Sequence, residues 1–326
     1  MPITPPSDRA IFERIVADYS STIEPMLGGF EARRVQALWG VTALVVAAIA
    51  IAITAMLVPG WREYTVIVSA MAGFVVVAGS AVLLSRVRKS LEVSLLGSVA
   101  DSMGFAYRRN LARPEYFRLF RSCKLVPDFD EESWEDEIVG EYTGHEFDVV
   151  ECKLEKIERD RDGDETKNTV FHGQLIRLAY SKRFAGTTVV QRDAGPLNRF
   201  TKPGKGYSHV GLASAKFERA FEVWSTDQVE ARDLLDPVVL ERFQALEGHF
   251  KGKRLRAAFV EGSLIIAVET GNAMSAASMF RSLNDPTHIE KILKEFDLIF
   301  DLIDLVGARV EGRISGPLSL SDLKSA

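Results

Sequence analysis

Trp39–Val58 reads WGVTALVVAAIAIAITAMLV, and Tyr64–Leu84 reads YTVIVSAMAGFVVVAGSAVLL. Neither stretch contains a charged residue. At a rise of about 1.5 Å per residue, a helix of about 20 residues matches the ~30 Å hydrocarbon core of a bilayer. The two stretches therefore predict a transmembrane hairpin over residues 35–85, with spans at 39–58 and 64–84. The alternative, a pair of buried core helices in a soluble protein, is disfavoured because two uncharged stretches of this length rarely occur together by chance.

Positive charge lies at the two outer ends of this hairpin. The connection Pro59–Glu63 carries one arginine beside a glutamate, whereas the outer ends carry Arg33, Arg34, Arg86, Arg88 and Lys89. Because lysine and arginine are retained on the cytoplasmic side, we expect both termini in the cytoplasm. The first apolar run starts too late and is too long for a cleaved signal peptide. We therefore expect an uncleaved multi-pass protein of the inner (cytoplasmic) membrane.

Aromatic side chains mark both expected membrane interfaces. Trp39 begins the first span, and Trp61 and Tyr64 lie at the connection between the spans. Amphipathic rings of this kind are favoured at the level of the lipid headgroups. The predicted membrane-interface residues are therefore Arg33, Arg34, Trp39, Trp61, Tyr64, Arg86, Arg88 and Lys89.

The interior of the spans indicates a structural role. Its polar residues are only threonines and serines: Thr42, Thr54, Thr65, Ser69 and Ser80. Ion relays and substrate pathways usually need ionisable groups, so we do not expect transport by this chain alone. Small residues recur along both spans and permit close helix packing. Besides the lipid bilayer, the expected partner is another membrane protein or a second copy of the chain, unless the hairpin packs only on itself.

Composition restricts the partners of the rest of the chain. The protein has 326 residues, of which 26% are charged, and its net charge is −5. These values are typical of globular material, and the acidic balance argues against nucleic acid as a partner. The cysteines Cys123 and Cys152 have no spacing typical of a disulfide framework or a zinc site. We therefore expect buried free thiols in a reducing compartment.

Helical patterns flank the hairpin on both sides. Residues 1–34 are interpreted as an amphipathic cytoplasmic helix, interrupted at Pro25 and at Gly28-Gly29. Residues 86–125 are interpreted as a stalk whose helical pattern covers Ser85–Asn110. The two flanking helices are expected to pair with each other through apolar residues at steps of four: Ile11, Ile15, Tyr19 and Ile23 before the hairpin, and Leu91, Leu95, Val99 and Met103 after it.

Residues 126–306 are predicted to form a cytoplasmic α+β domain. Short, partly alternating runs indicate strands, with hairpin turns at Thr143-Gly144-His145 and Glu261-Gly262. Two segments are expected to be loops, the charged stretch Lys153–Thr169 and the Gly- and Pro-rich stretch Asp193–Gly206. Because most links between strands are short, we expect a mostly antiparallel sheet with packed helices. Residues 307–326 are predicted to form a C-terminal tail.

Three helices of this domain have clear start signals. Asp227 can cap a helix over Gln228–Leu235, and the pairs Asp236-Pro237 and Asp285-Pro286 place a cap before a first-turn proline. The last helix, Thr287–Val306, has an apolar stripe and a second one on its opposite side. It must therefore pack on the sheet and also on another element or chain.

No constellation of residues predicts a reaction. Asp160–Glu165 (DRDGDE) lacks the positions of an EF-hand loop, and Lys202–Gly206 (KPGKG) lacks the P-loop arrangement. The acidic residues between Asp128 and Glu137 have no fixed ligand spacing. The histidines are scattered, and no GxSxG motif is present. We therefore predict no catalytic residue, no metal site and no cofactor.

Several blocks of the sequence resemble a known family. They are FERAFEVWSTDQVEARDLLDPVVLERFQAL (Phe217–Leu246), VFHGQLIRLAYSKRFAGTTVVQRD (Val170–Asp193), WEDEIVGEYTGHEFDVVECKL (Trp134–Leu154) and the final strand-strand-helix segment. Together with the hairpin, they resemble the bacterial membrane family called domain of unknown function 3137 (DUF3137). The resemblance implies no activity and no catalytic residues. Within these blocks, Gly186 is expected where a turn or a close backbone approach is needed.

Two functions are consistent with these observations. The first is a non-enzymatic binding or scaffold module at the cytoplasmic face of the membrane, whose partner is another membrane protein or an anionic lipid surface. The alternative is a membrane-anchored, hydrolase-like enzyme with a site beside the Asp193–Gly206 loop. A pocket containing a perturbed His172, His209 or Cys152 would favour the enzyme.

Overall fold

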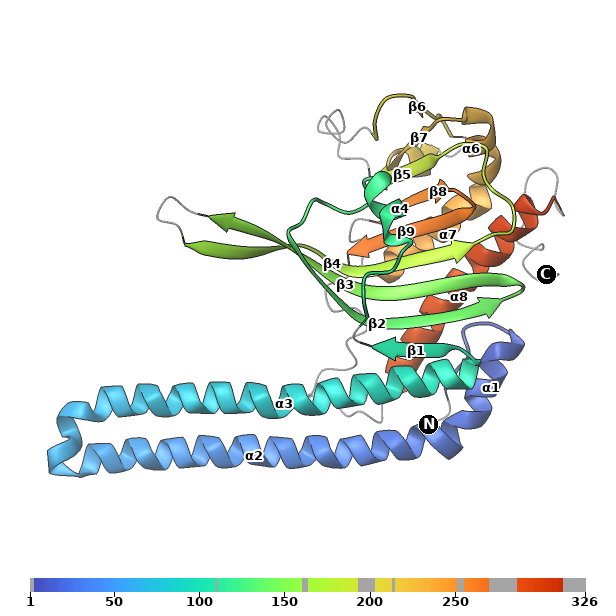
Figure 1. Ribbon diagram of the computed structural model, residues 1–326. Coiled ribbons are helices and arrows are strands. Elements are labelled where there is room, and N and C mark those ends of the chain that lie inside the picture. Colours follow the sequence, from blue (N-terminus) through green and yellow to red (C-terminus); the bar gives the residue numbers. More distant parts are fainter. Residues whose placement is uncertain are drawn as a thin grey trace. The chain divides into compact units, whose positions relative to one another are not determined.

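The computed structural model describes residues 3–109, 111–159, 164–192, 203–212, 215–250, 255–269 and 286–312, without the side chains of Pro59, Trp61, Arg62, Ala215 and Lys216. The chain divides into two compact units (Figure 1). One comprises Met1–Met103 with Ser275–Lys291, and the other comprises Gly104–Met274 with Ile292–Ala326. The first is helical, and the second contains the sheet.

The helical unit is built from a broken helix, a tight turn and a second long helix. α1 (Ala10–Asp18) passes through a π-helical turn (Tyr19–Ile23) into α2 (Glu24–Leu57), and a 3₁₀ turn (Pro59–Tyr64) leads into α3 (Thr65–Met103). The predicted interruption at Gly28-Gly29 is wrong, because both glycines lie within α2. Pro25 occupies the first turn of α2, where a missing N–H is tolerated. The break lies earlier, in the π-helical turn.

The parts of these helices outside the predicted spans pack together. Ser98 Oγ of α3 lies 3.5 Å from Met26 Sδ of α2, and α1 contacts α3. The flanking helices therefore pair as predicted, although Phe12 is buried in α1 beside Ile15 and Ile11 is only half-buried. The buried side chains include Phe12, Ile15, Tyr19 and Ile23 from the first part of the chain and Leu91, Leu95, Val99 and Met103 from α3.

α3 ends earlier than the helical pattern predicts. It stops at Met103 and is followed by Gly104, whose φ of +79° lies in the left-handed region. Glycine adopts this conformation readily and commonly terminates helices. The chain then forms strand β1 (Ala106–Arg109) and a separate short helix, α4 (Phe117–Ser122). The sequence pattern predicts neither element.

The second unit contains a nine-stranded antiparallel sheet in the described part of the chain, which confirms the α+β prediction (Figure 1). The strand order is β1-β2-β3-β4-β9-β8-β5-β7-β6. Besides β1, the strands are β2 (Glu131–Tyr142), β3 (His145–Arg159), β4 (Glu165–Ala179), β5 (Thr188–Arg192), β6 (Ser208–His209), β7 (Phe221–Ser225), β8 (Arg256–Val260) and β9 (Ser263–Glu269). The remaining helices are α5 (Ala215–Glu218), α6 (Gln228–Leu234), α7 (Pro237–His249) and α8 (Thr287–Val310).

Helices cover both faces of this sheet, with α4 on one side and α7 and α8 on the other (Figure 1). On the α4 face, Phe117 packs edge-on against Trp134, with 4.9 Å between ring centroids. On the α8 face, Phe300 stacks on Tyr142 at 4.1 Å, and Phe147 contacts the same helix. The alternation of side chains along each strand therefore supplies both layers of the core.

The two predicted hairpin turns are confirmed, but the predicted loop Lys153–Thr169 is wrong. Thr143-Gly144 and Glu261-Gly262 all have positive φ, the conformation of a tight two-residue turn. In the charged stretch, β3 continues to Arg159 and β4 begins at Glu165, in register from Glu155–Thr169 to Arg159–Glu165. Arg159 and Glu165 form an ion pair across the two strands at 2.6 Å. A charged sequence that resembles a solvated loop can therefore also form a two-stranded ribbon.

α8 begins at the predicted residue and extends past the predicted end, to Val310. Its second half is buried on all sides, as predicted, including Leu298, Leu302 and Leu305. The acidic residues of the helix have partners in other elements: Asp301 lies 3.1 Å from Arg242 of α7, and Asp304 accepts a hydrogen bond from Thr143 Oγ1. The tail beyond residue 312 lies outside the described residues.

Candidate functional site

The outer surface of the hairpin is apolar along its length. Val66 is 81% exposed, Phe74 is 73% exposed and Val77 is 71% exposed. The most apolar windows of the two helices are 6% and 0% buried. Both helices are long and apolar enough to cross a membrane. Apolar surface of this extent is typical of a region that meets lipid or another protein.

Glycine contacts fix the packing of α2 against α3. A Cβ atom built on Gly79 would lie 3.0 Å from Leu44 Cδ1, and one built on Gly40 would lie 3.4 Å from Leu83 Cδ1. Each pair joins one helix to the other, so these small residues serve the contact within the hairpin. Gly73, by contrast, has no atom near its Cβ position.

Three threonine hydroxyls of the hairpin are satisfied by main-chain carbonyl groups. Thr42 Oγ1 donates to the carbonyl of Leu38, Thr54 Oγ1 to that of Ala50, and Thr65 Oγ1 to that of Ala55. Such bonds let hydroxyl groups lie in an apolar environment without exposing a polar atom. These residues therefore have a local structural explanation.

The predicted interface residues fall at the two ends of the hairpin. Trp39 is 70% exposed near the outer end of the apolar part of α2, and Tyr64 is 57% exposed at the connection. The side chain of Trp61 lies outside the described residues. Arg34 makes a two-pronged salt bridge with Glu31, with N–O distances of 2.6 and 2.9 Å.

The remaining predicted cations differ in their surroundings. The guanidinium of Arg33 lies 5.2 Å from the centre of the Phe30 ring. Arg88 is half-buried and engaged within the protein, whereas Arg86 and Lys89 are exposed. The five basic residues, which the sequence gives no reason to distinguish, therefore differ in exposure and in their contacts.

A group of buried polar side chains lies between the sheet and α8. Glu151 of β3 is almost fully buried, and its Oε1 lies 3.3 Å from Nε2 of His172 on β4. Gln174 is the cross-strand partner of Glu151, and Glu295 of α8 interacts with both. Glu295 Oε2 also lies 3.9 Å from Nε2 of His249 at the end of α7. We call these five residues the α8 polar cluster.

Burial controls the protonation of this cluster. It raises the pKa of Glu295 to about 7; the neighbouring Gln174 opposes the shift, and the carboxylate of Glu151 adds to it. Burial also raises the pKa of Glu151, against the effect of the adjacent His172. Glu295 therefore exchanges a proton near neutral pH. Because both carboxyl groups are buried, this exchange affects folding stability.

A second polar group lies on the α4 face of the same strands. Arg177 of β4 donates to Asp148 of β3 at 2.7 Å, lies 3.5 Å from Glu146, and stacks over the Tyr116 ring at 5.0 Å. Burial raises the pKa of Tyr116 well above its ordinary range. Each charged group here has a partner, and the phenol stays protonated, so the arrangement is explained by packing.

The two cysteines, which are the candidate nucleophiles, are buried. Cys152 and Cys123 are free and buried. Burial raises the pKa of the Cys152 thiol well above its ordinary value, and raises that of Cys123 to about 11. Since the thiolate is the reactive form, neither residue is suited to nucleophilic catalysis. His209 packs edge-on against Trp224 instead, with 5.4 Å between ring centroids.

Metal binding has no support in the described part of the chain. No group of three or more His, Cys, Asp or Glu side chains among the described residues could hold a metal ion. Residues 160–163 of the DRDGDE stretch and residues 193–202 of the Asp193–Gly206 loop lie outside the described residues. The enzyme alternative expects its site beside the Asp193–Gly206 loop. Most of that loop lies outside the described residues.

His145 and Gly307 join the β2–β3 turn to the end of α8. A Cβ atom on Gly307 would lie 2.6 Å from Nε2 of His145, so only glycine permits this approach. The same nitrogen lies 3.3 Å from Glu311 Oε1. The sequence gives no signal for this contact, because the two residues are distant in the chain.

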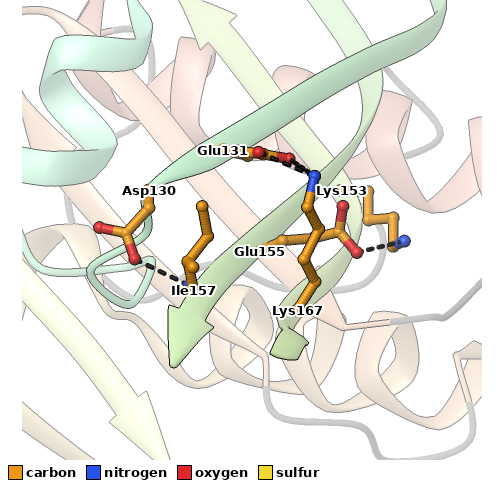
Figure 2. A network of polar contacts seen from close by, with 6 residues as sticks. All are labelled: Asp130, Glu131, Lys153, Glu155, Ile157 and Lys167. Atoms are coloured by element: carbon orange, nitrogen blue, oxygen red, sulfur yellow. Dashed lines mark hydrogen bonds and ion pairs between the residues drawn. The ribbon is translucent and has the colours of Figure 1, made fainter. Parts of the chain in front are cut away.

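The ends of β3 and β4 project beyond their neighbours as a two-stranded arm held by polar contacts, shown in Figure 2. Lys167 Nζ lies 2.6 and 2.8 Å from the two carboxylate oxygens of Glu131, and Lys153 Nζ lies 2.6 Å from Glu155 Oε1 (Figure 2). Asp130 Oδ2 accepts a hydrogen bond from the main-chain N–H of Ile157 at 2.8 Å. The carboxylate thus occupies one main-chain donor on the edge of β3, which discourages pairing with another strand.

The segment around Gly186 meets the start of α6, which accounts for the close backbone approach that the sequence predicts at this glycine. A Cβ atom on Gly186 would lie 2.8 Å from Cβ of Asp227. Asp227 caps α6 by accepting from the N–H groups of Val229 and Glu230. Glu230 in turn accepts from the N–H groups of Ala185 and Gly186 at 2.7 and 2.8 Å. These residues of the recognisable blocks therefore have structural roles.

Comparison with known proteins gives one family and one solved structure. The model of the family described as "Protein of unknown function (DUF3137)" matches residues 169–307, the segment from β4 to α8. No curated protein matches the chain. The crystal structure of the mycobacterial trehalose monomycolate transport factor A, TtfA, is 11% identical, with a TM-score of 0.37 over 68% of this chain and 95% of that chain. A similarity at this level carries no inference about fold or function. The match covers residues 169–307, and this segment is similar to the DUF3137 family that the sequence blocks resemble.

Proposed function

We propose that this protein is a membrane-anchored binding module without catalytic activity. Its hairpin lies in the inner membrane with both termini in the cytoplasm, and its α+β domain is displayed on the cytoplasmic side. The partner is another membrane protein or a second copy of the chain. The exposed apolar surface of the hairpin carries this proposal.

The degree of exposure supports insertion into lipid. A core helix of a soluble protein buries most of its apolar residues, whereas the most apolar windows here are 6% and 0% buried. The second helix, Thr65–Met103, follows the first directly, so a cleaved leader would explain only one of the two. Three of the internal hydroxyls are bonded to main-chain carbonyls, as a low-dielectric environment requires.

The sheet domain supports binding over catalysis. Its two thiols are buried and protonated. The two carboxyl groups of its α8 polar cluster are buried, and its second polar group is internally paired. Among the described residues, the exposed features of the domain include the charged β3–β4 arm and isolated apolar residues such as Val229. Surfaces of this kind are more suitable for contacts with a partner than for holding a small substrate.

Cysteine labelling tests the membrane topology. The two native cysteines are buried and give a low background. We would introduce Glu63→Cys in the connection and Thr166→Cys in the arm, and treat intact bacterial cells with a membrane-impermeant maleimide. The proposal expects labelling of E63C in intact cells and of T166C only after permeabilisation. Labelling of T166C in intact cells, or release of the chain by carbonate, would overturn the topology.

Purification tests the binding role. The full chain, expressed at native level, would be crosslinked in cells, extracted in mild detergent and sized by light scattering. We expect the unmodified chain to form a specific complex or an oligomer. The double variant Phe74→Ala/Val77→Ala, which changes the exposed surface of the hairpin, should no longer form it. A monomer that carries no protein in either form would contradict the proposal.

A further inference from the structure

The packing of α2 on α3 determines which basic residues of the two helices lie at the same height along the hairpin axis. Leu44 meets Gly79, and four residues earlier in α2 Gly40 meets Leu83, four residues later in α3. These contacts define one antiparallel register. Continuing it past Gly40 places Ala37 level with Arg86 and Arg34 level with Lys89. The contact of Met26 with Ser98 shows that the register continues beyond this point.

The basic residues of the two helices therefore form one belt just outside the apolar region. Trp39, which is 70% exposed, lies between this belt and the apolar part of α2. Tryptophan at such a position is typical of the headgroup level of a bilayer. The belt thus lies where phosphate groups of lipids would be.

Two basic residues of the belt already interact with other groups of the protein. Arg34 is 11% exposed, and its guanidinium makes the two-pronged bridge to Glu31 at 2.6 and 2.9 Å. The pair is neutral as a unit. Arg88 is half-buried and interacts within the protein.

Three members remain available. Arg86 and Lys89 are exposed on α3 and, within the described part of the chain, make no ion pair. They lie three residues apart and so share one side of the helix. Arg33 is exposed on α2, and the Phe30 ring at 5.2 Å restricts its guanidinium without neutralising it. A neutral pair and three unneutralised cations leave the belt with a net positive charge.

We infer that Arg33, Arg86 and Lys89 bind the phosphate headgroups of anionic phospholipids, while Arg34 and Arg88 do not contribute. This inference rests on the proposed function, because it requires the hairpin to lie in a bilayer. Charge complementarity and the adjacent Trp39 select an anionic lipid surface as the occupant. Each cation near such a surface strengthens association by about fivefold, and the effect is screened by salt.

Fluorescence quenching tests the inference on the full chain. The protein, with Trp61→Phe as background, would be reconstituted into vesicles containing either brominated phosphatidylglycerol or brominated phosphatidylcholine. Trp39 then reports the lipid next to the belt, while Trp134 and Trp224 in the sheet domain give a constant signal. The triple variant R33Q/R86Q/K89Q is compared with the double variant E31Q/R34Q, which removes one charge of each sign.

The expected result is a relative association constant for phosphatidylglycerol at least about fivefold above that for phosphatidylcholine. The triple variant and about 1 M salt should remove this preference, and E31Q/R34Q should keep it. Equal quenching by the two lipids in the unmodified belt, or a preference that survives in the triple variant, would overturn the inference alone. Absence of quenching by both lipids would instead overturn the proposed function, and this inference with it.

Discussion

The hairpin and the sheet domain place the same kinds of side chain in opposite environments. In the domain, Phe147 and Phe300 are fully buried, and the acidic residues of α8 that lie inside have polar partners. In the hairpin, Val66 and Phe74 are exposed, and three threonines bond to main-chain carbonyls. The domain is organised for water outside, whereas the proposed function places the hairpin in an apolar surrounding. Under that proposal, the exposure of a side chain has to be judged against the medium that each region meets.

The largest expected effect comes from truncating an aromatic residue inside the domain. Phe147 contacts Phe105, Phe296 and Phe300, so Phe147→Ala should lower the free energy of unfolding by about 3–5 kcal/mol. Phe74→Ala in the hairpin is the matched control and should leave domain stability unchanged. Hydrogen exchange of β3 peptides in the full chain measures both, and equal effects would break the comparison.

A charge introduced on the exposed surface of the hairpin should weaken membrane insertion rather than the stability of the domain. Phe74→Arg is expected to disfavour membrane insertion by about 3 kcal/mol. Val229→Arg is the control, because Val229 is 79% exposed on the domain and its replacement should have no effect. The membrane-bound fraction after carbonate washing gives the readout. If F74R partitions like V229R, the exposed surface of the hairpin does not meet lipid.

The buried carboxyl group of Glu295 makes the domain sensitive to pH. Its pKa is raised from an ordinary value near 4.5 to about 7, so between these values the folded state binds more protons than the unfolded state. Stability is therefore fully present below about pH 4.5 and is lost as the pH rises through 7, by about 3 kcal/mol in total. Glu295→Gln should remove this dependence and protect α8 at neutral pH.

Hydrogen exchange of α8, corrected for the intrinsic effect of pH, measures this change. The exposed Glu241→Gln on α7 serves as control and should retain the dependence of the unmodified chain. A pH profile of α8 that is identical in E295Q and E241Q would exclude Glu295 as its origin.

A smaller effect is expected where α8 meets the β2–β3 turn. Gly307→Ala places a methyl group against His145 Nε2 and should destabilise the domain by about 1–3 kcal/mol. Adding His145→Ala should relieve part of this loss, because the obstructing ring is then gone. A double-mutant cycle from urea unfolding measures the coupling, and additive effects would show that the two residues do not interact.

The smallest effect is expected at the start of α6. Asp227 accepts two main-chain hydrogen bonds there, so Asp227→Ala should lower stability by about 1 kcal/mol. Asp227→Asn should keep most of the stability, since asparagine also caps helices. Local exchange rates of α6 separate these cases, and equal rates in both variants would argue against capping.

Local patterns explain why much of the fold could be predicted from the sequence. The apolar spans, the turns at Thr143-Gly144 and Glu261-Gly262, and the caps Asp227 and Asp236 depend on neighbouring residues. The charged strands beyond Lys153 could not be predicted, because their ion pairs exist only after β3 and β4 have paired. α4 and β1 were missed because they are too short to show a period.

The candidate sites were less predictable than the fold. Glu151, His172 and Glu295 meet only when β3, β4 and α8 pack together, and no spacing in the sequence indicates this. The basic residues beside the spans were predicted as a set from their position. Their separation into a neutralised Arg34 and an exposed Arg86 and Lys89 needed the contact with Glu31 to be known.

The order of elements along the chain has a consequence for biosynthesis. α8, which covers one face of the sheet, follows every strand, and roughly 200 residues separate it from the end of the second apolar run. At about 5–20 residues per second, the ribosome adds α8 about 10–40 s after that run. During this interval the strands lack the cover for Phe147 and Tyr142. A chaperone that binds nascent chains would therefore find its target on this face, and would have to leave before α8 packs there.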